Sequence, residues 1–161
     1  MMSENLQHLI GFVISGIVVT FAVVLHYEAL RFLGRTLGKH VHKRIGMLLV
    51  MLGLLLAHIL EIWCFALGYM LMQHGIGLGY ITGMEKGDLM DYVYYSSVVY
   101  TTIGFGDLLP VGAMRMLSAA EGLAGLALIT WSASFTFAAM HHFWTHPLED
   151  SNTDTQPRRK D

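Results

Sequence analysis

Charged residues are scarce in this chain, and cysteine is nearly absent. Charged residues make up 14% of the 161 residues, against about a quarter in ordinary soluble domains. The single cysteine, Cys64, excludes a disulfide framework and a metal site built from several thiolates. Twelve acidic and ten basic residues leave a formal net charge of −2, so no basic surface is available for nucleic acid. With 54% hydrophobic residues, the chain is suited to a lipid bilayer.

Three hydrophobic stretches are long enough to cross a bilayer, whose hydrocarbon core needs about 20 residues of helix. They cover 1–33, 45–72 and 114–142. His58 and Glu61 interrupt the second stretch, and Glu121 is the only charge between residues 116 and 140 of the third. Backbone groups in lipid must be hydrogen-bonded within their own segment, so all three stretches are predicted to be transmembrane helices. The predicted fold class is therefore an all-α integral membrane protein.

The positions of the basic residues predict the orientation of the chain in a cell membrane, plasma or inner. The connection at 34–44 is basic, and three basic residues lie in the tail at 143–161. Positive residues favour the cytoplasm, so the amino terminus is predicted to lie outside and the carboxyl terminus inside. Ser3 and Glu4 stand where a signal peptide has basic residues, so we interpret the first stretch as a retained span. The polar tail is predicted to be disordered.

Four basic residues recur at every fourth position around the first connection. They are Arg31, Arg35, Lys39 and Lys43. These residues follow an apolar stretch and are interleaved with glycine and histidine, which favours an interfacial helix bound to anionic lipid headgroups. Voltage sensing is the alternative interpretation, because a voltage sensor also carries regularly spaced basic residues, although within an apolar span.

A short helix and a returning loop are predicted between the second and third spans. A glycine-rich outer loop at 73–87 precedes a helix at 89–101, for which Asp88 is a suitable N-cap and Asp91 lies in the first turn. At about 1.5 Å per residue this helix is about 20 Å long, too short to cross the bilayer. The chain must therefore enter and return through 102–107. Irregular backbone at membrane depth is tolerated where protein buries it or where it lines a water-filled cavity.

The returning segment has the composition needed to bind a dehydrated cation. Backbone carbonyls replace the hydration water of K⁺ when the chain alternates between conformations that direct the carbonyls to one side. Gly104 and Gly106 supply the positive φ that such alternation requires, and Thr102 adds a hydroxyl. Ile103 and Phe105 are expected to point away and pack behind the loop. The negative C-terminal end of the preceding helix favours a cation in the cavity beneath.

Residues 94–110, Tyr-Tyr-Ser-Ser-Val-Val-Tyr-Thr-Thr-Ile-Gly-Phe-Gly-Asp-Leu-Leu-Pro, resemble the pore helix and selectivity filter of potassium channels. The family's Thr-Val-Gly-Tyr-Gly-Asp filter is matched with two conservative changes, Ile103 and Phe105. Pro110 and Gly125 stand where the family has a proline-containing turn and a glycine hinge. The resemblance covers about 45–142 as a pore domain, so the first span is extra.

The resemblance implies a homotetramer that conducts K⁺ passively, because one filter segment per chain cannot enclose an ion alone. The expected K⁺ ligands are the carbonyls of Thr102, Ile103, Gly104 and Phe105. Asp107 is expected to brace the outer mouth. The inner helix is expected to line the cavity through Leu126, Ile129, Ala133 and Phe137. A bend near Gly125 is a candidate gate, and Phe137 and His141 are candidates for an inner constriction. No cofactor beyond permeant K⁺, and no enzymatic activity, is expected.

The sequence departs from the family pattern at two positions near the filter. Phe105 lacks the hydroxyl of the family's usual tyrosine, and Val98 stands where some members carry a carboxylate that bridges to the terminal aspartate. Tyr94 and Tyr95 are the two candidates to donate a hydrogen bond to Asp107 instead. Potassium selectivity is predicted, and a non-selective cation channel of the same architecture is the alternative.

Two carboxylates lie inside predicted spans, where a charge costs about 2.5 kcal/mol or more. Glu61 follows His58 by one helical turn, so the pair is predicted to form either a proton-sensitive gating element or a polar clamp between helices. Glu121 is predicted to make a structural hydrogen bond.

The chain has nine histidines, which leave open a non-conducting scaffold or a haem-binding subunit as alternative functions. Only His58 is placed well inside a span, and His26 is placed near an interface. No serine has a base and an acid at a recognisable spacing, so the sequence gives no support for hydrolase chemistry.

Overall fold

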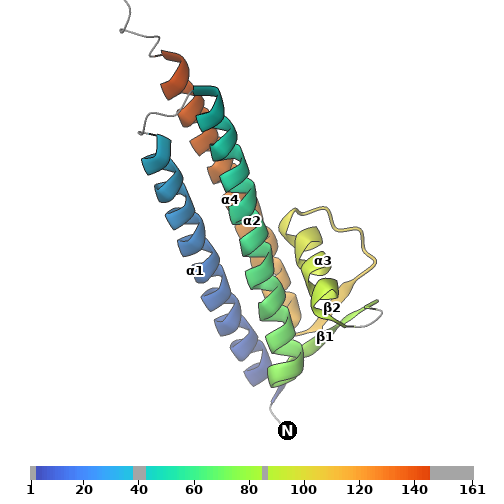
Figure 1. The fold of residues 1–161 in the computed structure, drawn as a ribbon. Helices are drawn as coiled ribbons and strands as arrows, with labels where there is room; N and C mark the ends of the chain where they lie inside the picture. The colour runs from blue at the N-terminus through green and yellow to red at the C-terminus, as the bar shows by residue number, and fades with distance from the viewer. Residues whose placement is uncertain (1–2, 38–42, 85–86, 146–161) are drawn as a thin grey trace, which may run out of the picture.

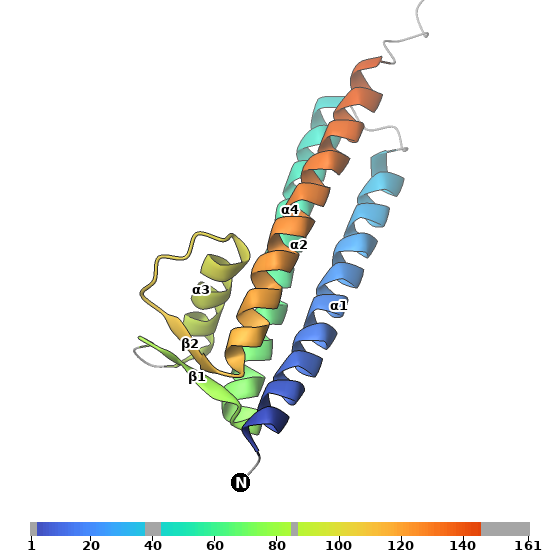
Figure 2. The ribbon, with the colours of Figure 1, turned by 180° about the vertical axis from the view of Figure 1, so that it is seen from behind.

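Three long helices form the body of the protein, and a short helix with a small sheet lies beside one end of it. The computed structural model describes residues 3–37, 43–84 and 87–145. The elements in chain order are α1 (Glu4–Leu37), α2 (Lys43–Met70), the π-helix η1 (Leu71–Ile76), β1 (Gly79–Thr82), α3 (Leu89–Tyr100), β2 (Leu109–Gly112) and α4 (Met114–Thr145). α1 and α4 run in one direction and α2 in the other, and the amino-terminal end of α1 lies at the same end as the sheet (Figures 1 and 2).

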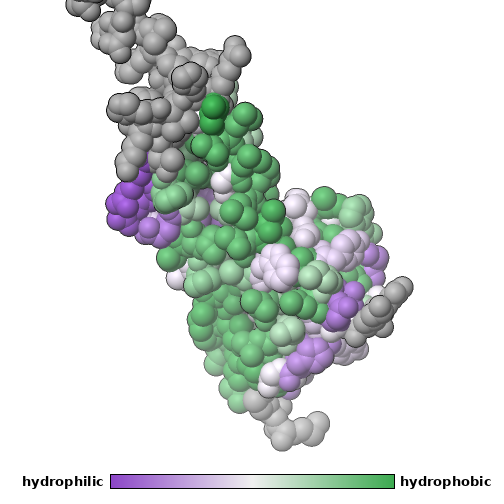
Figure 3. Space-filling view, in the orientation of Figure 1, coloured by the Kyte–Doolittle hydropathy of each residue, from purple (hydrophilic) through white to green (hydrophobic). Residues whose placement is uncertain are grey.

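The three long helices have the length and composition of membrane spans. The candidate spans are Glu4–Arg35, Ile45–Ile76 and Met114–His141. Hydrophobic residues cover the outside of these helices, while hydrophilic residues gather near the carboxyl end of α1 and around α3 and the sheet (Figure 3). Large exposed apolar surfaces are rare on soluble monomers and suit a bilayer. The predicted all-α membrane fold with three spans is confirmed.

The long helices extend beyond the hydrophobic stretches that predict them. α1 continues to Leu37 rather than ending near residue 33, and α4 continues to Thr145 rather than 142. Hydropathy reports the part of a helix that suits lipid, whereas polar helix formers such as Arg31 and Arg35 let the backbone continue past it. Arg31 is exposed, with Nη1 donating to Oε1 of Glu28 at 2.9 Å. Lys39 and the side chain of Lys43 lie outside the described residues. The tail from residue 146, with its three basic residues, also lies outside them.

The predicted outer loop contains a strand that the sequence analysis did not anticipate. β1 pairs with β2 in an antiparallel register that matches Gly79 with Gly112 and Thr82 with Leu109. A Cβ on Gly79 would lie 2.1 Å from the Val111 carbonyl oxygen, so this close strand approach requires glycine. The two strands join the end of the second span to the start of the third and so fix the ends of the segment that carries α3.

α3 begins at a capping box. The Asp88 carboxylate accepts hydrogen bonds from the backbone N–H of Met90 at 3.0 Å and of Asp91 at 3.1 Å. The Asp91 carboxylate in turn accepts from the N–H of Gly87 at 2.7 Å and of Asp88 at 3.3 Å. These bonds satisfy the free donors of the first turn and set the start of the helix by local chemistry alone.

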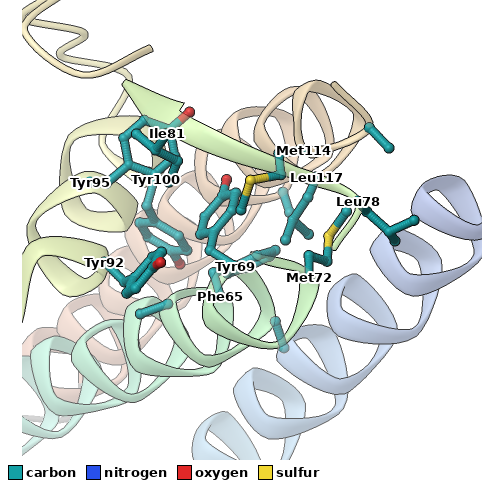
Figure 4. Packing of buried hydrophobic residues seen from close by; sticks show 14 of the residues in the cluster. Phe65, Tyr69, Met72, Leu78, Ile81, Tyr92, Tyr95, Tyr100, Met114 and Leu117 are labelled. Atoms are coloured by element: carbon teal, nitrogen blue, oxygen red, sulfur yellow. The ribbon is translucent and has the colours of Figure 1, made fainter. Parts of the chain in front are cut away.

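One apolar core holds α3 against α2 and α4. Figure 4 shows its larger side chains: Phe65, Tyr69, Met72, Leu78, Ile81, Tyr92, Tyr95, Tyr100, Met114 and Leu117. The rings of Tyr69 on α2 and Tyr95 on α3 meet edge to face with centroids 5.0 Å apart, an arrangement that contributes about 0.5–1.5 kcal/mol beyond area burial. Because one side of α3 is packed in this way, the loop that follows the helix starts from a fixed position.

Candidate functional site

The segment after α3 returns along the side of that helix that faces away from the three long helices (Figures 1 and 2). Its backbone alternates in sign of φ. Thr102, Gly104 and Gly106 have φ of 58°, 57° and 81°, whereas Ile103 and Phe105 are not among the residues with positive φ. Thr102 is the only non-glycine residue with positive φ in the part of the chain that the structure describes. The glycines predicted this conformation at Gly104 and Gly106, whereas nothing in the sequence indicated it at Thr102.

The amides of the returning segment are bonded to the end of α3. The N–H of Thr102 donates to Val99 O at 2.9 Å, and the N–H groups of Ile103 and Gly104 donate to Val98 O at 3.1 and 3.4 Å. No carbonyl of 102–106 accepts a hydrogen bond from the residues that the structure describes, and the whole segment is exposed. Unpaired carbonyls in a membrane protein require water or a cation as a partner.

The two large side chains of the segment do not pack behind it in the single chain. Ile103 is 58% exposed and Phe105 is 68% exposed, so the expectation that they pack behind the loop is wrong for the isolated subunit. The described residues of a single subunit therefore leave both side chains uncovered.

Asp107 at the end of the segment is held by one of the two candidate tyrosines. Tyr94 donates from its hydroxyl to Oδ2 of Asp107 at 2.9 Å, and this hydrogen bond raises the pKa of Tyr94. Tyr95 does not reach Asp107, because its hydroxyl hydrogen-bonds with Oγ of Ser118 on α4 at 2.7 Å. Consecutive residues of a helix point about 100° apart, so only one of them faces the returning segment.

Gly125 lies where α4 crosses the end of α3. A Cβ at this position would lie 2.2 Å from the carbonyl oxygen of Tyr100. α4 is continuous through this point, from Met114 to Thr145. The close approach to Tyr100 gives a packing reason for the glycine, and a hinge at Gly125 stays a prediction.

The face of α4 that was expected to line a cavity is exposed. Leu126, Ile129, Ala133 and Phe137 all lie on it. Ile129, Ala133 and Phe137 also border an apolar cavity of about 660 Å³ between α2, α4 and the end of α3. His141 is exposed as well.

Glu121 is fully buried and joins three helices. Ser96 of α3 donates to its Oε1, and Tyr69 of α2 donates to its Oε2, each at 2.5 Å. The oxygen of the Tyr69 hydroxyl also lies 3.2 Å from Ser118 Oγ, which hydrogen-bonds with the Tyr95 hydroxyl. Glu121 therefore holds α3 between α2 and α4. Ser96 and Tyr69 were missed in the sequence because they share no spacing pattern with Glu121.

Glu61 lies at the centre of a second buried polar group, which we call the Glu61 cluster: His26, His58, Glu61, Tyr100 and Ser132. Oε1 of Glu61 lies 2.8 Å from Nδ1 of His26, and Oε2 lies 3.0 Å from Nδ1 of His58 and accepts from the Tyr100 hydroxyl. Ser132 Oγ lies 2.9 Å from Nε2 of His58 and 3.4 Å from Nε2 of His26. His26 is fully buried, so its placement near an interface is wrong; α1 continues well past it.

Comparison with known proteins identifies the architecture. A family model described as ion channel matches residues 55–142, which is 88 of the 161 residues. The match begins within α2, includes α3 and the returning segment, and ends in α4, so α1 lies outside it. Neither the curated proteins nor the solved structures gave a match. The backbone alternation at 102–106, the short helix that supports it and this match over more than half of the chain together show that the protein belongs to the ion channel family.

Proposed function

We propose that this protein is a potassium-selective channel in which the 102–106 segment is the selectivity filter. The observation that carries the proposal is the alternating φ at Thr102, Gly104 and Gly106. Alternation of this kind directs successive carbonyls to one side, where they replace the hydration shell of K⁺. The carbonyls of Thr102, Ile103, Gly104 and Phe105 and the hydroxyl of Thr102 are the ligands, and the ion passes down its gradient.

Four copies of the chain surround the conduction axis in this proposal. A single filter faces an ion from one side only, and potassium filters are built from four such loops in closed cyclic symmetry. The exposed side chains of Ile103 and Phe105 then pack against the neighbouring subunit. The exposed α4 face, with Leu126 and Phe137 at its two ends, lines the cavity below the filter.

The sheet end of the molecule faces outward in the proposed membrane orientation. The basic residues Arg31 and Arg35 lie near the opposite end, at the carboxyl end of α1, where anionic headgroups of the cytoplasmic leaflet attract them. α3 starts at the sheet end and ends part of the way along the long helices (Figure 1). Its negative end therefore points toward the inner cavity and favours a cation there.

Ion flux into liposomes tests the proposal directly. We expect the purified protein to carry K⁺ down a gradient and to carry far less Na⁺ under the same gradient, and native mass spectrometry to give four chains per particle. Equal Na⁺ and K⁺ flux would instead support the non-selective cation channel. The absence of flux for both ions across a range of pH and lipid compositions would contradict conduction.

Tyr94→Phe is predicted to weaken potassium selectivity without abolishing conduction. The variant removes the hydroxyl that donates to Asp107 and leaves the ring. Because Phe105 has no hydroxyl of its own to brace the filter, the outer mouth then loses a support, and we expect the K⁺ to Na⁺ permeability ratio from reversal potentials to fall several-fold. Tyr80→Phe is the matched control, since Tyr80 is also an exposed tyrosine but lies on β1. Equal selectivity of both variants and the wild type would contradict the role of Tyr94.

A further inference from the structure

The Glu61 cluster gathers ligand atoms from α1 and α2 between the helices of the protein. His26 comes from α1, and His58 and Glu61 come from α2. One ligand atom of each of these three residues lies within 4.8 Å of the other two. His26 and Glu61 are fully buried, and His58 is partly buried. The hydroxyls of Tyr100 on α3 and Ser132 on α4 complete the surroundings.

The side chains of the cluster leave one negative charge without a positive partner and one nitrogen lone pair without a hydrogen-bond donor. When Glu61 is ionised and both histidines are neutral, the Nδ1–H groups and the Tyr100 hydroxyl donate to the carboxylate. Nε2 of His26 and Nε2 of His58 then both face Ser132, whose hydroxyl carries a single proton. Among the described residues, the side chains that bond Glu61 include no lysine or arginine. A buried site of this kind favours a cation, either a proton that makes one imidazole an imidazolium or a bound metal ion.

Two imidazoles and one carboxylate are the ligand set of many divalent transition-metal sites. Zn²⁺ binds histidine nitrogen and glutamate oxygen with four ligands, the last of which is often a water or a hydroxyl. Mg²⁺ and Ca²⁺ prefer oxygen ligands throughout and fit this set poorly. A route into the site also exists, because His58, Tyr100 and Ser132 border the cavity of about 660 Å³.

We propose that His26, His58 and Glu61 bind one divalent transition-metal ion, of which Zn²⁺ fits best, and that this ion clamps α1 to the pore domain. His26 lies outside the residues that match the family, whereas the other two ligands lie inside them. Tyr100 precedes the filter residue Thr102 by two positions, so the site adjoins the support of the filter. The ion neutralises the charge of Glu61. It replaces the protons that otherwise lie between the carboxylate and Nδ1 of the two histidines.

Metal titration of the purified protein tests the site. The protein is stripped with a chelator, dialysed against ZnCl₂ and analysed for bound metal, and CoCl₂ is used in parallel for its ligand-field absorption. We expect one tightly bound ion per chain and a Co²⁺ spectrum typical of tetrahedral coordination. His26→Gln and His58→Gln are each expected to weaken binding by about tenfold or more.

Two control variants separate the loss of a ligand from the loss of the fold. His8→Gln removes an exposed histidine of the same helix as His26, and Ser134→Ala removes an exposed serine of α4 that lies outside the Glu61 cluster. Both are expected to bind metal with nearly the wild-type stoichiometry. Size-exclusion profiles identify any variant that fails to assemble, and the wild-type Co²⁺ spectrum tests the site without a variant. A wild-type protein that binds no ion, or His26→Gln and His58→Gln proteins that bind as tightly as wild type, would overturn the proposal and leave a histidinium as the cation of the cluster.

Discussion

Gly104→Ala is expected to abolish potassium flux while the protein still folds and assembles. Gly104 has φ of 57°, and an added Cβ would meet nothing within 4 Å. The only penalty is therefore conformational, about 1–2 kcal/mol for an L-residue in the left-handed region. A folded protein of ordinary stability tolerates this cost. The filter does not, because the chain relieves the strain by rotating a peptide plane, which turns a carbonyl away from the axis in each of the four proposed subunits.

Gly77→Ala is the matched control for this prediction. Gly77 has φ of 71° and likewise has nothing within 4 Å of an added Cβ, but it lies between η1 and β1, away from 102–107. We expect the two variants to lose similar thermal stability in detergent and only Gly104→Ala to lose flux in liposomes. If Gly104→Ala conducted K⁺ like the wild type, residues 102–106 would not form the filter. If Gly77→Ala also lost flux, the loss would reflect general strain.

The parts of the fold that are set by local chemistry could be predicted from the sequence. The spans follow from long stretches of high hydropathy, and the start of α3 follows from Asp88 and Asp91, whose carboxylates accept hydrogen bonds from backbone amides within four residues. Gly104 and Gly106 mark the returning segment for the same reason, since positive φ is a property of a single residue. Each of these signals depends on a few neighbouring positions.

The features that arise from contact between distant segments could not be predicted in this way. β1 and β2 pair across about 30 positions, and neither four-residue strand has a pattern of its own. Thr102 takes positive φ because bonds to Val98 and Val99 fix the amides around it, and threonine gives no sign of this. His26 was misplaced because the end of an apolar run is a poor guide to the end of a helix.

α1 is joined to the pore domain by polar as well as apolar contacts. Gly11 lies close to Ala113, since an added Cβ would be 2.9 Å from the Ala113 side chain. Leu30 and Leu33 pack with Val50 and Leu54 at the other end of the helix. His26 bonds to the cluster between these two contacts. A helix that only anchored the chain in lipid would need no buried polar residue, so the position of His26 indicates a structural connection to α2, α3 and α4.

Gly125→Ala is expected to be the most destabilising single-methyl addition in α4. The new Cβ would lie 2.2 Å from the Tyr100 carbonyl oxygen and 3.0 Å from the Tyr100 carbonyl carbon, so backbone must move. Overpacking of this kind costs about 1–3 kcal/mol, and contact with backbone places it toward the upper end. Tyr100, whose backbone the new Cβ displaces, is two positions before the first filter residue. We therefore expect K⁺ flux to fall together with the melting temperature.

Gly122→Ala is the control on the same helix. Its Cβ would lie 3.8 Å from the Val99 carbonyl oxygen, an ordinary contact, so the substitution should gain about 1 kcal/mol of helix propensity. The two variants are therefore expected to shift the melting temperature in opposite directions, measured by circular dichroism of the detergent-solubilised protein. The glycine hinge implied by resemblance makes a different prediction, because alanine at a hinge would alter channel opening and leave stability unchanged or higher. A Gly125→Ala protein as stable as Gly122→Ala would contradict close packing as the reason for this glycine and favour the hinge.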